Sequence, residues 1–120
     1  MVVTVLIVDD SSYARDGLRS ILGHDAAIEV VGEAENGCDA IEQAMRLRPD
    51  VILMDLQMPA MDGLEATRCI KTHLPLQRVI CLAVHPHNGS AALDAGASSY
   101  LLKDAPRDQL LAAIRGSVES

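Results

Sequence analysis

The stretch VILMDLQMPAMDG, residues 51–63, decides the fold. Its first four residues are apolar and include the β-branched Val51 and Ile52, a pattern typical of a strand buried on both faces of a parallel sheet. This strand ends on Asp55, and a turn-rich segment over residues 57–63 leads into a predicted helix over residues 64–72. A buried strand followed by a turn and a helix is therefore the unit expected elsewhere in the chain.

The same unit begins the chain. Residues 2–8 form a nearly continuous apolar run that ends in Asp9-Asp10. Ser11 or Ser12 can cap the helix that follows, and Gly23 ends it.

The alternation then continues to the C-terminal end. Further strands are predicted at residues 28–34, 79–84 and 100–102, and further helices at residues 38–47, 90–95 and 110–118. Parallel neighbours need crossover connections, which place helices on both faces of the sheet. We predict an α/β fold with a doubly wound, five-stranded parallel sheet, as one domain over residues 1–120 with a possible linker start near residues 116–120.

The composition excludes several functional classes. A formal charge of −7 leaves no broad basic surface for a nucleic-acid backbone, and with no Trp or Phe, base stacking is not expected. No apolar run approaches the ~20 residues of a membrane span, and the N-terminal sequence lacks a signal-peptide pattern. We expect a cytoplasmic protein that contacts no membrane and whose domain does not itself bind nucleic acid.

The three cysteines lack the close spacing of a metal motif. Cys38, Cys69 and Cys81 are therefore expected to be reduced thiols, mostly buried. The four histidines are also too scattered to indicate a zinc site.

Charged residues follow three of the predicted strands. Asp9-Asp10 closes the first, Asp55 the third and Lys103 the fifth, at the sheet edge where ligands of such folds bind. A helix cap is the alternative role for Asp10 alone. Neighbouring carboxylates need a compensating proton or cation, and Mg²⁺ suits them because it takes oxygen ligands and can share a phosphoryl oxygen. A carboxylate so placed can attack phosphorus, so Asp55 is predicted to accept a phosphoryl group that Lys103 stabilises.

Three motifs now support a family resemblance. LIVDD, VILMDLQMPAMDG and GASSYLLKD resemble, in order and at about the usual spacing, the signatures of the response-regulator receiver family of two-component systems. The first and last, with VVGEA and NGCDAIE, also resemble the NarL/LuxR-type subgroup. The likeness implies the flavodoxin-like (βα)5 receiver fold and a phosphorelay in which a sensor histidine kinase or phosphotransfer protein is the donor. It implies no enzyme activity beyond the domain's own phosphorylation and dephosphorylation.

The resemblance also assigns roles to individual residues. It implies Asp10 and Asp55 as direct magnesium ligands, Asp9 acting through water, and the Gln57 backbone carbonyl completing the set. Asp55 would be the phosphoacceptor, and Lys103 would pair with the phosphoryl oxygens. The remaining assignments are the loop residues Pro59 and Gly63, and Tyr100 as the aromatic that rotates inward on activation.

The resemblance extends to partners. It implies transcription regulation through a DNA-binding output domain that lies outside these residues, and a homodimer through the fourth helix, fifth strand and fifth helix. The choice of kinase is expected to depend on the first helix and adjoining loops, including Ser12, Tyr13 and Arg15. For Tyr100, a plain half-buried strand position remains the alternative.

The fourth strand departs from the family pattern. It usually ends in Ser or Thr, whose hydroxyl bonds the phosphoryl group, but here Ala83 holds that position and no hydroxyl lies between Arg78 and Asn88. A hydrogen bond to a charged group is worth about 1–3 kcal/mol, so the coupling between phosphorylation and switching is expected to be weakened. His85 or His87 could replace it.

The fourth helix departs as well. The stretch from Ala83 to Gly96 is about two residues shorter than the pattern, and Pro86 and Asn88-Gly89 disfavour helix before residue 90. Residues 90–95 are left as little more than one turn.

Three alternatives stay open. A degenerate receiver that binds partners without phosphorylation is favoured by Ala83 and the short helix, and opposed by the intact acids and Lys103. A phosphatase with an aspartyl phosphate would want a D-x-D pattern on its first strand. A flavin carrier would want an uncharged phosphate loop there, and Asp9-Asp10 would repel that phosphate.

Overall fold

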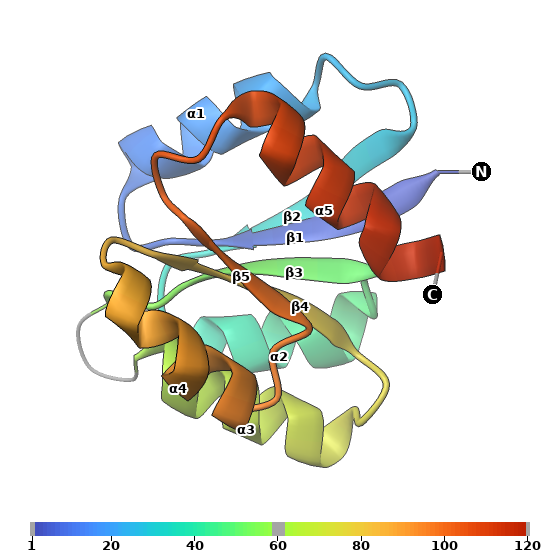
Figure 1. Cartoon of the computed structure of the whole chain (residues 1–120). Coiled ribbons are helices and arrows are strands. Elements are labelled where there is room, and N and C mark those ends of the chain that lie inside the picture. Colours follow the sequence, from blue (N-terminus) through green and yellow to red (C-terminus); the bar gives the residue numbers. More distant parts are fainter. Residues whose placement is uncertain (1, 59–61, 120) are drawn as a thin grey trace.

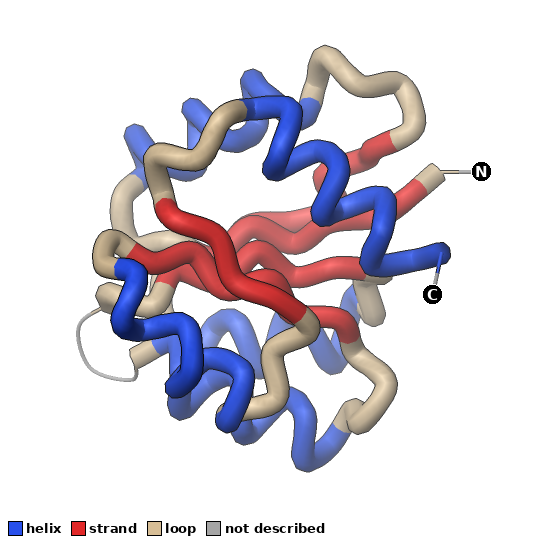
Figure 2. The backbone as a smooth tube through the Cα atoms, in the orientation of Figure 1, coloured by secondary structure: helices blue, strands red, loops and turns tan. Residues whose placement is uncertain are grey.

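The computed structural model describes residues 2–58 and 62–119 and contains one five-stranded parallel sheet. The strand order is β2-β1-β3-β4-β5, with helices on both faces (Figures 1 and 2). This confirms the predicted doubly wound sheet. The strands are β1 (Val3–Val8), β2 (Ile28–Ala34), β3 (Val51–Asp55), β4 (Arg78–Ala83) and β5 (Ser99–Leu102).

The helices form two layers. Figure 1 shows α1 and α5 on one face of the sheet and α2, α3 and α4 on the other. Their bounds are α1 (Ser12–Leu22), α2 (Gly37–Leu47), α3 (Gly63–His73), α4 (Gly89–Asp94) and α5 (Arg107–Glu119). None of the helices in the described residues is long and apolar enough to cross a membrane.

Each face of the sheet has its own core. Because successive strand residues point to opposite faces, Leu6 and Val8 pack with α2, α3 and α4, whereas Val5 and Ile7 pack with α1 and α5. All four are essentially inaccessible to solvent. The apolar runs of the sequence are therefore continuous because both faces of every central strand are covered.

Polar side chains fix where the helices begin. Ser11, not Ser12, caps α1, its Oγ accepting from the Ala14 backbone N–H at 3.2 Å. Asn36 and Asp62 cap α2 and α3 in the same way. Each cap follows a strand directly or after a short loop, so the helix starts are tied to the strand ends.

The predicted short fourth helix is confirmed. α4 has six residues and follows a 3₁₀ turn at Pro86–Asn88. The α-helix begins at Gly89, one residue earlier than expected, and the fixed φ of Pro86 suits the first position of a 3₁₀ turn that the sequence prediction did not include.

The expectation for the cysteines was only partly right. The three thiols are free, but only Cys81 is buried; Cys69 is intermediate and Cys38 is exposed. Cys38 is the second residue of α2 and lies on the solvent side of that helix, whereas Cys81 lies in the central strand β4. Burial raises the pKa of the Cys81 thiol to about 11, so it is an unreactive core residue.

Candidate functional site

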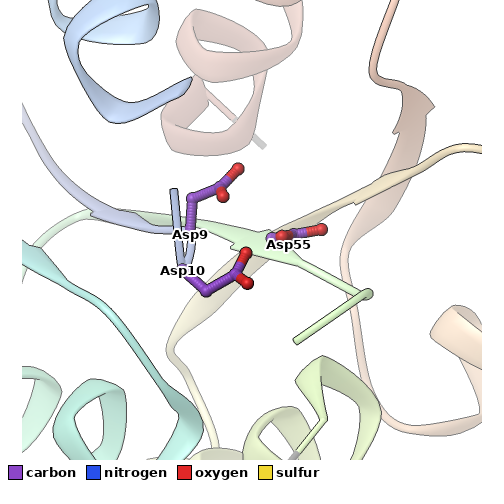
Figure 3. A group of neighbouring side chains, drawn as sticks. All are labelled: Asp9, Asp10 and Asp55. Atoms are coloured by element: carbon purple, nitrogen blue, oxygen red, sulfur yellow. The ribbon is translucent and has the colours of Figure 1, made fainter. Parts of the chain in front are cut away.

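Two neighbouring strands bring three carboxylates together. β1 and β3 pair in a register that sets Val8 opposite Met54, so Asp9 and Asp55 follow at the same edge of the sheet. Asp9, Asp10 and Asp55, here called the acidic cluster, each offer an oxygen within 4.8 Å of the others. Figure 3 shows all three side chains extending to the same side of the strand ends.

Lys103 reaches this cluster from the far edge of the sheet. Its backbone N–H donates to the Ala83 carbonyl at 2.8 Å, which extends the β4–β5 pairing. Its Nζ lies 3.0 Å from Asp55 Oδ1 and 3.3 Å from Asp9 Oδ2. The structure thus brings together the four charged residues that the sequence placed at strand ends.

Asp55 is the most buried member of the cluster, with no solvent-exposed surface. Oδ1 accepts from the Gln57 backbone N–H at 3.0 Å and from Lys103. Burial raises the pKa of Asp55, and the charge of Asp9 raises it further, while the Gln57 N–H and Lys103 act in the opposite direction. Desolvation outweighs the hydrogen bonds, so the ionised form lacks compensation.

The second oxygen of Asp55 has a different environment from the first. Oδ2 is buried and has no hydrogen-bond partner among the described residues. A buried carboxylate oxygen without a partner is uncommon in folded proteins and indicates a ligand, an ion or a water at that place. With three carboxylates and one ammonium, the site has excess negative charge and only oxygen donors, a set that fits Mg²⁺.

The other oxygens of the cluster are not equivalent. Asp9 is 2% exposed, and its two oxygens accept from the Ser11 backbone N–H at 2.9 Å and from Lys103. Asp10 is exposed, and no described residue donates a hydrogen bond to its carboxylate. The oxygens left for a cation are thus those of Asp10 and Asp55 Oδ2, with Asp9 already engaged.

Lys103 is held in its charged form. Burial lowers the pKa of its ammonium, but the hydrogen bond and charge of Asp55 and the charge of Asp9 outweigh burial, and the net pKa is raised. Its side chain remains 32% exposed. A cation at this position can meet an anionic group entering from solvent.

The predicted loop residues fall on both sides of the described boundary. Pro59 lies outside the described residues. Gly63 begins α3, and a Cβ there would lie 2.2 Å from the Asp55 backbone carbonyl and 2.9 Å from Leu56 Cα. Only glycine fits against this backbone, so Gly63 lets α3 start directly beside the end of β3.

The end of β4 holds alanine where the family pattern has a hydroxyl. Ala83 is fully buried at the end of β4. The ring of Tyr100 is partly buried and lies against α4, where a Cβ on Gly89 would come within 2.1 Å of Tyr100 Cζ. His85 is exposed, and the His87 side chain lies outside the described residues. The sequence marked Asn88-Gly89 only as a turn, so this packing of Tyr100 was not foreseen.

The first helix presents its residues unequally. Tyr13, on the first turn of α1, is 89% exposed. Arg15 is turned inward, with its side chain 15% exposed and in contact with Glu33 and the Asp9 backbone. The sequence prediction named Arg15 among the residues that determine the choice of kinase and missed these contacts.

Comparison with known proteins gives consistent results. Residues 5–115 match the family described as response regulator receiver domain. The response regulator protein VraR of Staphylococcus saprophyticus is 44% identical over 117 residues, which cover 96% of this chain and 56% of VraR. A protein-glutamate methylesterase/protein-glutamine glutaminase of Pseudomonas aeruginosa is 48% identical over 108 residues, covering 87% of this chain and 29% of that protein.

Solved structures agree with the sequence relatives. The response regulator domain of Thermotoga maritima CheB superposes with a TM-score of 0.92 at 34% identity, covering 100% of this chain and 98% of that one. The receiver domain of NarL from Mycobacterium tuberculosis gives 0.86 at 33% identity, covering 96% and 98%. The chain spans about half the length of its staphylococcal relative, so that protein contains sequence with no counterpart here.

Proposed function

The chain belongs to the response regulator receiver family, and from this premise we propose that Asp55 accepts a phosphoryl group from a phosphohistidine in a Mg²⁺-dependent reaction. The observation that carries the proposal is the state of Asp55: Oδ1 is bound by Lys103 and the Gln57 N–H, while Oδ2 is buried without a partner. The matched relatives give no support to the phosphorylation-independent alternative.

The residues would share the transfer as follows. The Asp55 carboxylate supplies the oxygen that bonds to phosphorus, and the contacts of Oδ1 with Lys103 and the Gln57 N–H limit the rotation of that carboxylate. As the O–P bond forms, the P–N bond of the phosphohistidine breaks and its electron pair returns to the imidazole. The Lys103 ammonium, 3.0 Å from Oδ1, lies where it can neutralise charge on the transferred oxygens.

The acidic cluster would hold the metal. We assign Asp10, Asp55 and the Gln57 backbone carbonyl as direct ligands and Asp9 as a ligand through water, consistent with the oxygens that the protein leaves free. When bound, Mg²⁺ supplies charge neutralisation for the phosphoryl oxygens.

The first test is phosphorylation by a small donor. Incubation with acetyl phosphate and MgCl₂ is expected to add one phosphoryl group, seen by intact-mass spectrometry. The adduct should disappear in Asp55→Asn and with excess chelator. Asp16→Asn, which changes an exposed carboxylate on α1, is the matched control and should be labelled like the wild type. Labelling of Asp55→Asn at the wild-type level would refute the assignment.

The natural partner is proposed to be a sensor histidine kinase or a phosphotransfer protein, and the exposed Tyr13 of α1 is a candidate contact. We place the reaction in the cytoplasm and expect no enzyme activity beyond the domain's own phosphorylation and dephosphorylation. The net charge of −7 supports the absence of direct nucleic-acid binding by this domain.

The output is proposed to be a DNA-binding domain outside residues 1–120. Similarity to VraR and to the NarL receiver supports the NarL/LuxR-type subgroup and transcription regulation. The relative from Pseudomonas aeruginosa is named for methylesterase and glutaminase activities, so its name indicates an output other than DNA binding. The reading frame beyond residue 120 decides between them, because a helix-turn-helix pattern there would identify the DNA-binding type.

We propose that Asp55 is still phosphorylated but that the conformational change which follows phosphorylation is weakened. Ala83 offers no hydroxyl to a phosphoryl group on Asp55, and Tyr100 already packs against α4. A homodimer through α4, β5 and α5 is expected to respond less to phosphorylation than in receivers with Ser or Thr at this position.

A further inference from the structure

Arg15 links the first helix to the acidic cluster, and we propose that it is a positioning residue for Mg²⁺ binding. The proposal rests on the function proposed above. Arg15 Nη1 donates to the Asp9 backbone carbonyl at 2.6 Å, and its Nε donates to Glu33 Oε1 at 2.8 Å. Glu33 lies on β2, so the guanidinium connects the C-terminal ends of the neighbouring strands β1 and β2.

The atom that Arg15 binds matters because of the peptide to which it belongs. The Asp9 carbonyl is part of the planar Asp9–Asp10 peptide, so fixing it also orients the N and Cα of Asp10. On the other side, the Asp9 N–H donates to the Ala34 carbonyl at 3.1 Å. The chain at the end of β1 is thus held from both sides.

Asp10 depends on this backbone support. Its carboxylate is exposed and receives no hydrogen bond from any residue in 2–58 or 62–119. The carboxylates of Asp9 and Asp55 are oriented by hydrogen bonds and ion pairs. Among the described residues, only the backbone conformation orients the carboxylate of Asp10. Loss of the Arg15 contact would therefore disorder the cluster member that is proposed to bind the metal directly.

A positioning role for Arg15 and a purely electrostatic role predict opposite effects of its removal on Mg²⁺ affinity, so an experiment can distinguish them. A guanidinium near three carboxylates repels an incoming cation, so removing its charge alone would tighten Mg²⁺ binding. Removing a group that orients a metal ligand weakens binding, typically by 10–100-fold. A weakened affinity therefore identifies positioning.

Arg19 provides the matched control. Its Nε donates to the other oxygen of the same carboxylate, Glu33 Oε2, at 2.7 Å. It is 48% exposed, and none of its described contacts is to Asp9. Replacing Arg19 removes the same charge and a similar ion pair while leaving the Asp9–Asp10 peptide held.

The experiment is titration of the protein with MgCl₂ at constant ionic strength, followed by calorimetry. Arg15→Met keeps an unbranched stem and removes the donors. We expect it to raise the Mg²⁺ dissociation constant about tenfold. Arg19→Met should leave the constant unchanged or lower it. Thermal unfolding without metal checks that both variants are folded.

Arg15→Lys is the second variant and covers a failure of Arg15→Met to fold. It retains the charge, but a single ammonium lacks the planar fork that spans Glu33 and the Asp9 carbonyl, so weaker binding is again expected. An unchanged or tighter affinity in the Arg15 variants, or an equal loss in Arg19→Met, would overturn the role of Arg15. If the wild type itself bound no Mg²⁺, the proposed function would fall as well.

Discussion

Asp55 and Ala83 lie at the ends of neighbouring strands and are proposed to affect two different steps. Asp55 concerns the acceptance of the phosphoryl group, and Ala83 concerns the conformational response to it. Asp55 has the surroundings of a phosphoryl acceptor, with Lys103 in contact and one oxygen free. Ala83, next to it in the sheet edge, is buried and has no hydroxyl to report the phosphoryl group. Acceptance and switching are therefore expected to respond to different substitutions.

Ala83→Thr tests the missing hydroxyl. We expect the variant to dimerise more strongly on phosphorylation than the wild type, because the new hydroxyl can donate to a phosphoryl oxygen, a contact worth about 1–3 kcal/mol. The measurement is the monomer–dimer equilibrium by sedimentation, with and without acetyl phosphate and Mg²⁺.

Ala83→Val is the control for this experiment, because valine adds the same bulk without the hydroxyl. Equal behaviour of the Thr and Val variants, or no gain in either, would show that the hydroxyl is not the missing part.

At the scale of elements, the packing of the short α4 against the strand β5 includes a contact that requires glycine. Gly89, at the start of α4, leaves the space that the Tyr100 ring fills. Packing of this kind depends on a glycine that the sequence marks only as a turn residue.

Gly89→Ala should displace the Tyr100 ring and lower the free energy of unfolding by about 1–3 kcal/mol, because the new Cβ would lie 2.1 Å from Cζ. Urea unfolding measures the loss, and ring NMR signals report the displacement. The matched control is Gly17→Ala in α1, where, apart from the neighbouring residues and the backbone of the helix itself, no atom lies within 4 Å of the new Cβ. There alanine should stabilise the helix by about 0.5–1 kcal/mol. A Gly89→Ala variant as stable as Gly17→Ala, with unmoved ring signals, would contradict the contact.

At the scale of the whole molecule, the acidic cluster lowers the stability of the folded state, and a bound cation is expected to restore it. The cluster concentrates negative charge in a chain that is already at −7, and Asp55 is buried with a raised pKa. Ligands that bind only the folded state stabilise it by mass action. Mg²⁺ is therefore expected to raise the melting temperature of the wild type.

Asp55→Asn should unfold at a higher temperature than the wild type at neutral pH without metal. A carboxyl whose pKa is raised by folding binds its proton more tightly in the folded state, so its contribution to stability falls as pH rises above the ordinary value of 3.8. The difference between variant and wild type should grow from acid to neutral pH and vanish below that value, where both side chains are neutral. Calorimetric melting at several pH values measures it. A wild type that is more stable than Asp55→Asn at neutral pH would contradict the sign.

The sequence by itself determined the order of strands and helices, because the apolar runs and their turns are local patterns with periods of their own. It also placed Asp9, Asp10, Asp55 and Lys103 at strand ends, since parallel strands in a doubly wound sheet all end at one edge. The motif placed Gly63 in the loop after the acceptor, whereas the structure makes it the first residue of α3.

Tertiary structure decided which of those side chains touch and which atoms stay free. Lys103 and Asp9 are 94 residues apart, and only the strand order β1-β3-β4-β5 brings Nζ to 3.3 Å from Oδ2. The inward turn of Arg15 and the packing of Tyr100 on Gly89 likewise involve other elements. Local sequence patterns specify the elements and their buried faces. Contacts between side chains depend on how distant elements pack, and the helix or strand periodicity of a segment carries no information about that packing.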